Sequence, residues 1–178
     1  MTSNDVDVHK ADTLAPYIGQ DFLTWLWFTT EQTQGTIQTA SGEVYALVME
    51  QRVSVQGGEG ESRDTAVSSG PRSELREARL GLQSGKKVHQ ARVRIEKDEN
   101  LWQLQIRAED FALGSVKTPK VDMKLEEGED PDARFLEKVY LLEVAQEVVD
   151  DLFQLFLSKR FGPEWEREMA AIRGWIRT

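Results

Sequence analysis

The sequence predicts an α+β fold in which an antiparallel sheet of about five strands packs against one long C-terminal helix. Two observations carry this prediction. Residues 87–108 form two runs in which apolar and polar side chains alternate, the pattern of a half-buried β-hairpin. Residues 131–161 are rich in apolar side chains and continue without a breaker until Gly162-Pro163, as a long helix would.

The composition limits the class of protein. The 178 residues can bury a core without disulfides or metals. The chain has no cysteine, which excludes thiolate nucleophiles and cysteine–zinc sites and fits a reducing compartment. We find no signal peptide and no apolar run of about 20 residues, so we expect a cytoplasmic protein without a membrane span.

The N-terminal region divides into an arm and the start of a domain. We expect residues 1–16 to be a flexible N-terminal arm and residues 17–178 to be a single α+β domain. Residues 20–31 (QDFLTWLWFTTE) predict a short helix with apolar side chains on nearly all sides. A strand is the alternative for this run, because aromatic residues also favour strands.

Two further strands and a loop follow this helix. Apolar runs on either side of Ser41-Gly42 predict a hairpin over residues 36–55. A glycine-rich loop at 57–61 then leads to a short strand at 64–69.

A short helix connects this part of the sheet to the second hairpin. Ser73 suits the N-cap of a helix over residues 73–84, and Gly85 stands where a left-handed C-terminal glycine belongs. Its inner stripe is predicted to contain Leu75, Ala78 and Leu82.

The 87–108 hairpin is predicted to turn at Asp98-Glu99-Asn100. One face of its first strand should carry His89, Ala91, Val93 and Ile95. The opposite face should carry Val88, Gln90, Arg92 and Arg94. In the second strand, Trp102, Leu104, Ile106 and Ala108 alternate with Gln103, Gln105 and Arg107.

The C-terminal part is predicted to be helical. Residues 121–130 suit a mobile acidic loop, and Pro131 suits the first turn of the 131–161 helix. The apolar surface of that helix is wide enough to need cover on two sides, from the sheet and from flanking helices or a second subunit. A last helix should bury one stripe, which consists of Trp165, Met169, Ile172 and Ile176.

Charge is unevenly distributed along an acidic chain. The net charge is −9, which argues against nucleic-acid binding over the whole surface. Residues 72–94 nevertheless contain seven basic and two acidic side chains, a local net charge of +5. Residues 121–151 contain eleven acidic and three basic side chains, a local net charge of −8. These two regions predict an electrostatic dipole or an ordinary solvated surface.

The sequence offers little for catalysis. His89 is interpreted as a hydrogen-bonded core residue, and Gly85-Lys86-Lys87 lacks the first glycine and the Ser/Thr of a phosphate loop. The carboxylates of Glu143, Glu147 and Asp150 share a helical face but lack the histidines of a di-metal site. We expect no enzymatic activity, no cofactor, no metal and no small-molecule substrate.

The candidate binding surface is cationic. Lys86, Lys87, Arg92, Arg94 and Arg107 are predicted to form a compact patch at and beside the polar face of the hairpin, suited to phosphates. The alternative is a solvated face closed by cross-strand salt bridges. No aromatic residue is expected on this face, so stacking of single-stranded bases is not predicted.

Residues 43–161 resemble the C-terminal half of RdgC, the bacterial recombination-associated protein. The similarity begins with the strand pair at 43–55, the Ser84-Gly85-Lys86-Lys87-Val88 turn and the hairpin containing Trp102-Gln103-Leu104. It continues through Val116-Lys117 and an acidic segment that runs into Asp132-Ala133-Arg134-Phe135 and a long apolar helix. The N-terminal half of that family has no counterpart in this sequence.

The resemblance implies a function as well as a fold. It implies a ring-shaped homodimer that encloses duplex DNA without sequence preference, restrains RecA-driven recombination and has no catalytic residues or cofactor. Lys86 and Lys87 would match the Gly-Lys turn of the family, and Arg92 and Arg94 would lie in the strand after it. We therefore expect a cytoplasmic protein at the nucleoid, homodimeric or bound to a separate protein through the 131–161 helix. The alternative is a protein–protein interaction or adaptor module that keeps the fold without binding DNA.

Overall fold

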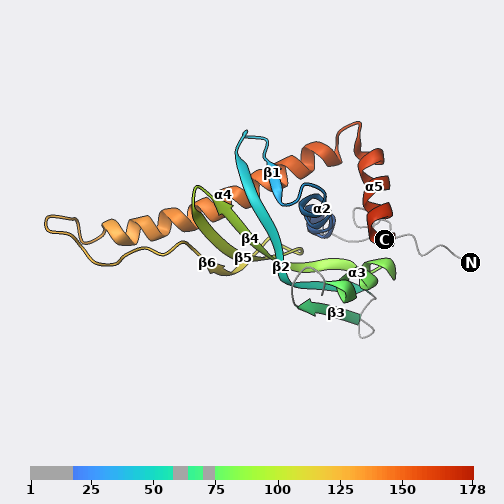
Figure 1. The fold of residues 1–178 in the computed structure, drawn as a ribbon, viewed down its shortest axis with the longest axis horizontal. Coiled ribbons are helices and arrows are strands. Elements are labelled where there is room, and N and C mark those ends of the chain that lie inside the picture. Colours follow the sequence, from blue (N-terminus) through green and yellow to red (C-terminus); the bar gives the residue numbers. More distant parts are fainter. Residues whose placement is uncertain (1–17, 58–63, 70–74) are drawn as a thin grey trace, which may run out of the picture.

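A computed structural model describes residues 18–57, 64–69 and 75–178, and Figure 1 shows how they are arranged. The predicted α+β class is confirmed, because antiparallel strands form one sheet and a long helix lies along it. The helices are α2 (Ile18–Gln32), α3 (Arg76–Gln83), α4 (Ala133–Arg160) and α5 (Trp165–Arg177). The strands are β1 (Thr36–Gln38), β2 (Val44–Gly57), β3 (Asp64–Ser69), β4 (Lys87–Lys97), β5 (Asn100–Arg107) and β6 (Leu113–Lys117).

The sheet is built from neighbouring antiparallel pairs. Its order is β1-β2-β4-β5-β6, and β3 pairs with the second half of β2. Both predicted hairpins are confirmed, at β1–β2 and at β4–β5. In the second hairpin Asp98 and Glu99 both have left-handed φ angles, of 49° and 65°. Two such residues form a type I′ turn, whose twist matches that of the strands it joins.

Helix α2 lies at the centre of the core. The predicted helix is confirmed over the strand alternative, and every residue from Asp21 to Phe28 is buried. It contacts the sheet at β2 and β4 and the helices α4 and α5, which explains why apolar side chains surround it. Its buried Thr24 and Thr30 hydroxyls each donate to a backbone carbonyl four residues earlier, at 2.9 Å in both cases.

Helix α4 joins this core from Leu141 onward. Its core residues are Ala145, Val148, Val149, Leu152 and Phe156. The Phe156 ring lies against those of Trp25 and Trp165, with centroids 5.6 and 5.9 Å apart. Towards the other end of α4, the Trp102 indole of β5 donates to the Leu141 carbonyl at 3.0 Å. The first turns of α4 extend past the sheet, as Figure 1 shows.

Helix α5 is fixed to α2 and α3 by one carboxylate. Its predicted inner stripe is confirmed, because Trp165, Met169, Ile172 and Ile176 are buried. Glu31 of α2 accepts hydrogen bonds from the indoles of Trp27, at 2.9 Å, and Trp175, at 2.7 Å. The same carboxylate pairs with Arg79 of α3 at 2.6 Å. The Arg79 guanidinium also lies over the Trp175 ring, 4.6 Å from its centroid. We call these four residues the Glu31 cluster.

The short helix α3 ends as the sequence predicts. Leu75, Ala78 and Leu82 are buried. Gly85 has a φ of +92°, and the amide of Lys86 donates to the Gly81 carbonyl at 3.0 Å. Together with the Gly85 amide bonded to the Leu82 carbonyl, this is a Schellman C-terminus. The predicted Ser73 cap and the predicted flexible N-terminal segment, residues 1–16, lie outside the described residues.

Strand β4 contains a bulge that corrects one prediction. Val55 pairs with Val88 while Ser54 pairs with Gln90, so His89 is an extra residue on β4. Val88 therefore faces the core with none of its surface exposed, and His89 is only partly buried. The prediction that placed His89 on the apolar face and Val88 on the polar face is wrong, because a bulge reverses the alternation beyond it.

Candidate functional site

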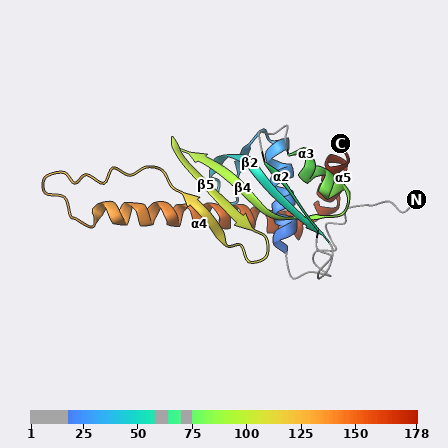
Figure 2. The same cartoon turned by 90° about the horizontal axis from the view of Figure 1, so that it is seen from below.

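No helix among the described residues covers one face of the sheet. Figure 2 shows β2, β4 and β5 in front of α2 and α4, which both lie behind them. The uncovered positions face the same way because cross-strand partners share a face. Across β4 and β5, Arg92 pairs with Gln105, Arg94 with Gln103, and Gln90 with Arg107. We call this surface the outer sheet face; it also includes the alternate residues Val44, Ala46, Val48 and Glu50 of β2, Glu96 of β4 and Leu101 of β5.

The opposite side chains of the same strands hold this face in place. Ala91, Val93 and Ile95 of β4 are at most 1% exposed and belong to the core. Leu104 and Ile106 of β5 are equally buried. Because the alternation is anchored by these apolar residues, the polar residues between them must point outward. The prediction of one apolar and one polar face is therefore confirmed from Ala91 onward.

Arg92 and Arg94 lie next to each other on this face. Arg94 has its Nε 3.3 Å from Glu96 Oε1, an ion pair along the strand. Arg92 forms no ion pair with any residue that the structure describes. Opposite Arg94, the Gln103 amide donates to Glu50 of β2 at 2.9 Å. The face thus combines one unpaired guanidinium, one paired guanidinium and several amide donors.

Lys117 extends the cationic surface to a third strand. It pairs with Gln103 across β5 and β6 and is exposed. Within the described part of the chain it has no ion-pair partner. Lys117 was not predicted as part of the site because β6 itself was not predicted: its short LGSVK run contains Gly114 and a bulge at Ser115, where φ is +49°.

Arg107 lies on the same face but is neutralised locally. Its guanidinium forms two hydrogen bonds with the Asp110 carboxylate, one of them 2.8 Å from Nε to Oδ1. The Arg107 hydrogen bond, together with the Ala112 amide, lowers the pKa of Asp110 from 3.8 to about 2. The charge on Arg107 is therefore compensated across the pH range in which proteins are handled. The ion pair of Arg107 is therefore local and not one of the cross-strand salt bridges named as the alternative.

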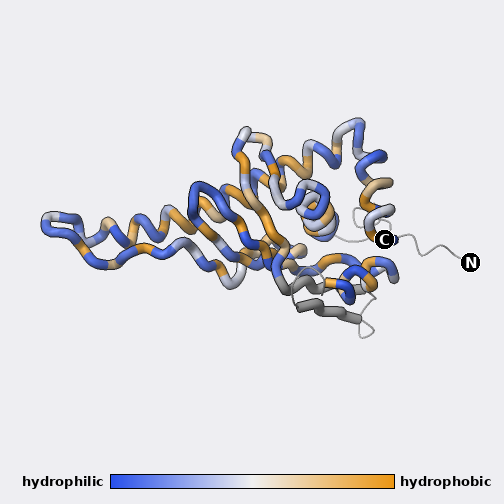
Figure 3. Tube along the Cα trace, in the orientation of Figure 1, coloured by the Kyte–Doolittle hydropathy of each residue, from blue (hydrophilic) through white to orange (hydrophobic). Residues whose placement is uncertain are grey.

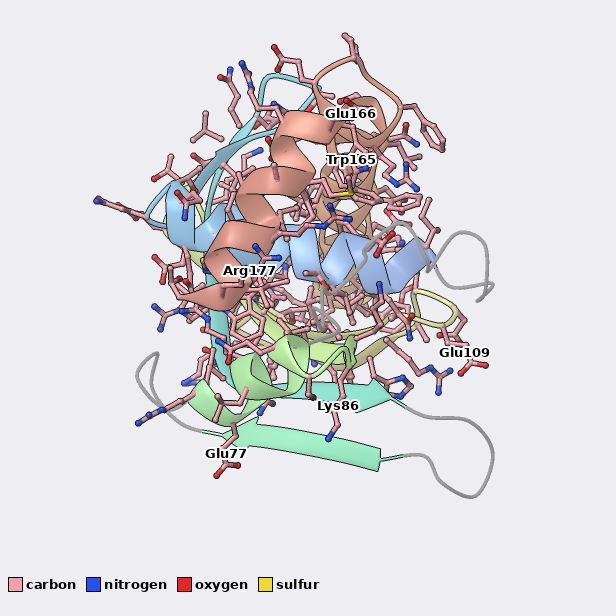
Figure 4. All side chains as sticks on the ribbon, turned by 90° about the vertical axis from the view of Figure 1, so that its right-hand side faces the viewer. Glu77, Lys86, Glu109, Trp165, Glu166 and Arg177 are labelled. Carbon is pink, nitrogen blue, oxygen red and sulfur yellow. The ribbon has the colours of Figure 1, made fainter. Side chains whose placement is uncertain are left out.

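The two lysines of the turn separate from the arginines. Lys87 has its Nζ 3.8 Å from the fully buried Asp21 carboxylate of α2, so it points to the helical layer. Lys86 lies just after α3, and Figure 4 shows it pointing away from α2. The predicted patch thus divides into Arg92, Arg94 and Arg107 on the outer sheet face and a separate pair of lysines at the turn.

The carboxylates of α4 are mostly spread over its exposed surface. Glu143, Glu147 and Asp150 are exposed, whereas Asp151 accepts a hydrogen bond from the Ser41 hydroxyl at 2.7 Å. Asp151 thereby connects α4 to the β1–β2 turn. No group of three histidine or acidic side chains in the described ranges is arranged to hold a metal.

A second surface lies on residues 118–143, which are the irregular segment after β6 and the first turns of α4. This part of the chain extends beyond the sheet (Figures 1 and 2), and from here on we call it the arm. Arg134 connects its two limbs through Glu129, at 3.1 Å. Several large apolar side chains on it are about half exposed: Met123, Leu125, Phe135, Leu136, Tyr140 and Leu142. Along this part of the chain, Figure 3 shows hydrophobic stretches alternating with hydrophilic ones.

Comparison with known proteins adds no further constraint. No protein-family model, curated protein or solved structure matches this chain. Among the residues described, no helix is both long and apolar enough to span a membrane.

Proposed function

We propose that this chain is a non-catalytic, RdgC-like protein that binds duplex DNA without sequence preference and acts in recombination at the nucleoid. The observation that carries the proposal is the outer sheet face, which bears cations and which no helix of the described ranges covers. Arg92, Arg94 and Lys117 lie on it across adjacent strands. Phosphate contacts use arginine, lysine and glutamine donors of this kind, and such contacts carry no sequence information.

The spacing of these donors suits a phosphate backbone. Arg92 and Arg94 are two residues apart on one strand, which places them about 7 Å apart. Lys117 lies across β5 from Arg94, about 10 Å away at the usual strand spacing. The described positions on this face bear no aromatic side chain, which favours backbone contact over base stacking.

The net charge of −9 sets the expected strength of binding. A few local cations on an acidic protein give weak binding that depends steeply on salt. With three phosphate contacts, the logarithm of the binding constant should fall with the logarithm of salt concentration with a slope of about −3.

The test measures binding of a labelled duplex in about 50 mM salt, where the electrostatic contribution is large. Arg92→Ala and Lys117→Ala should each weaken binding to all sequences alike and reduce the salt slope by about 1. Arg167→Ala on α5 is the matched control, since it removes an exposed cation that lies outside both the outer sheet face and α4. A wild-type protein that leaves duplex DNA unbound at this salt concentration would falsify the proposal.

A protein–protein interaction module is the second candidate, through self-association or a separate partner. The supporting observation is the exposure of Phe135, Leu136 and Tyr140 on the arm, at 63%, 59% and 62%. Only the first turns of the 131–161 helix present such a surface, because its second half is in the core. Light scattering on the purified chain tests this candidate, and a strict monomer that captures no partner contradicts it.

A further inference from the structure

The apolar surface of the arm is large enough to mark an interface. Six side chains are exposed by 46–63%: Met123, Leu125, Phe135, Leu136, Tyr140 and Leu142. At about 100 Å² each, half the area of a large apolar side chain, they present about 600 Å². That is at the upper limit for the largest patch of a typical monomer. It also approaches the roughly 800 Å² that each partner buries in a standard interface.

The charge of the arm narrows the choice of partner. Residues 118–143 contain eight acidic and four basic side chains, a local net charge of −4. Glu126 and Glu127 are exposed and form no ion pair with any described residue. A surface that covers the arm should therefore offer both apolar contacts and unpaired cations.

The outer sheet face has that combination. Arg92 and Lys117 are its unpaired cations within the described part of the chain. At the end near the β4–β5 turn, Val44 and Leu101 are 52% and 41% exposed. Leu101 lies diagonally across from Lys117, because Lys117 pairs with Gln103 two residues further along β5. An apolar residue and a cation thus lie near each other at this end of the face, as apolar and acidic groups do on the arm.

The two surfaces belong to one chain but do not meet within it. Figures 1 and 2 show the arm leaving the sheet lengthwise, away from the outer sheet face. A second copy of the chain can bring its outer sheet face to the arm of the first copy. If each arm covers the other copy's face, the contact is two-fold symmetric and closes at two subunits.

We propose that the arm of one copy docks on the outer sheet face of a second copy in a reciprocal homodimer. Where duplex DNA binds that face, as proposed above, the arm and the DNA compete for it. The acidic arm then acts as a shield that duplex DNA displaces at low salt. The first part of this inference concerns self-association alone; only the competition rests on the proposed function.

A charge-swap experiment tests the dimer without DNA. The arm variant is Glu126→Lys with Glu127→Lys, and the face variant is Arg92→Glu with Lys117→Glu. In a dimer of the arm variant, lysines face the native cations, and in a dimer of the face variant, glutamates face the native acidic arm. Each variant alone should therefore dimerise at least about tenfold more weakly in sedimentation analysis. Mixed in equal amounts, the two variants should restore the dimer. In the mixed dimer, the lysine arm of the arm variant meets the glutamate face of the face variant. The native arm of the face variant meets the native face of the arm variant.

Circular dichroism confirms that each variant is folded. Arg167→Glu on α5 is a matched charge reversal outside both surfaces, since the Arg167 side chain is 80% exposed, and it should leave dimerisation unchanged. A monomeric wild type at about 100 µM, a concentration far above that needed by a stable dimer, overturns the proposal. So does a face variant that still dimerises, which would indicate that the arms pair with each other, or a mixture that stays monomeric.

The competition has its own measurement. The arm variant should bind a labelled duplex at least about tenfold more tightly than the wild type, since it loses the shield and gains cations. Phe135→Ser with Leu136→Ser loses the shield without adding cations and should also bind more tightly. If wild type and both variants bind equally, the competition is refuted while the dimer stands. If none of them binds DNA, the proposed function fails and the dimer result is unaffected.

Discussion

Glu31 provides the most direct test of how the helical layer is held together. Its carboxylate receives two indole N–H groups and the Arg79 guanidinium, and it thereby joins α2, α3 and α5. Glu31→Ala removes all three contacts at once. Trp27 and Trp175 are almost fully buried, so their N–H groups lose a partner that water replaces only in part.

The size of the effect follows from the exposure of the partners. A hydrogen bond to a charged group contributes about 1.5–3 kcal/mol when it is buried. The side chains of Arg79 and Glu31 are 25% and 28% exposed, so solvent screens their ion pair and it contributes less than 1 kcal/mol. Counting the two indole bonds at the lower end, we expect Glu31→Ala to lower the free energy of unfolding by about 3 kcal/mol.

Urea denaturation followed by circular dichroism measures this loss without relying on the fluorescence of the altered tryptophans. Glu143→Ala is the control, since this exposed α4 carboxylate has no described partner and should change stability by at most about 0.5 kcal/mol. In a double-mutant cycle with Arg79→Ala, the two changes should be non-additive. The reasoning is refuted if Glu31→Ala is no more destabilising than Glu143→Ala.

Four further predictions concern single residues. Gly85→Ala should destabilise the protein by about 1 kcal/mol in thermal unfolding, because its φ is +92° and L residues are strained there. Gly174→Ala, in α5 with open space around its Cβ, should instead stabilise by up to about 1 kcal/mol, and equal signs would contradict both expectations. Carboxyl NMR should show Asp110 titrating with a pKa of about 2, and Arg107→Ala should return this pKa towards 3.8. The folded-state pKa of Asp110 is depressed, so its contribution to stability is present above pH 3.8 and is lost as pH falls through about 2; an unshifted pKa would contradict the ion pair. Trp102→Phe should cost about 1 kcal/mol in urea denaturation through its lost hydrogen bond to α4, and an unchanged midpoint would show that this bond contributes nothing.

Local patterns predicted most of the fold correctly. The run from Asp21 to Phe28 gave a helix apolar on all sides, and that helix is the centre of the core. Gly85 ended α3, and Asp98-Glu99 turned the second hairpin. These features depend on backbone conformation and on the period of apolar residues, and a sequence displays both directly.

Two departures from these patterns were not visible in the sequence. The bulge at His89 depends on how β4 pairs with β2, which are more than thirty residues apart in the chain. Strand β6 depends on the edge that β5 offers it, and its own five residues carry little β preference.

The candidate site was predicted in its composition but not in its organisation. Patterning along the chain was enough to predict an α+β protein with arginines on one face of a hairpin and a long apolar helix after an acidic segment. Only the tertiary structure separated Lys87, which faces Asp21, from Arg92 and Arg94, and added Lys117 to them through β6. It also decided which half of α4 is in the core and which half extends beyond the sheet. Strand alternation and helical period fix the side of an element on which a residue lies. Its ion-pair partners and the elements that pack over it come from parts of the chain that are distant in sequence, so local patterns do not reveal them.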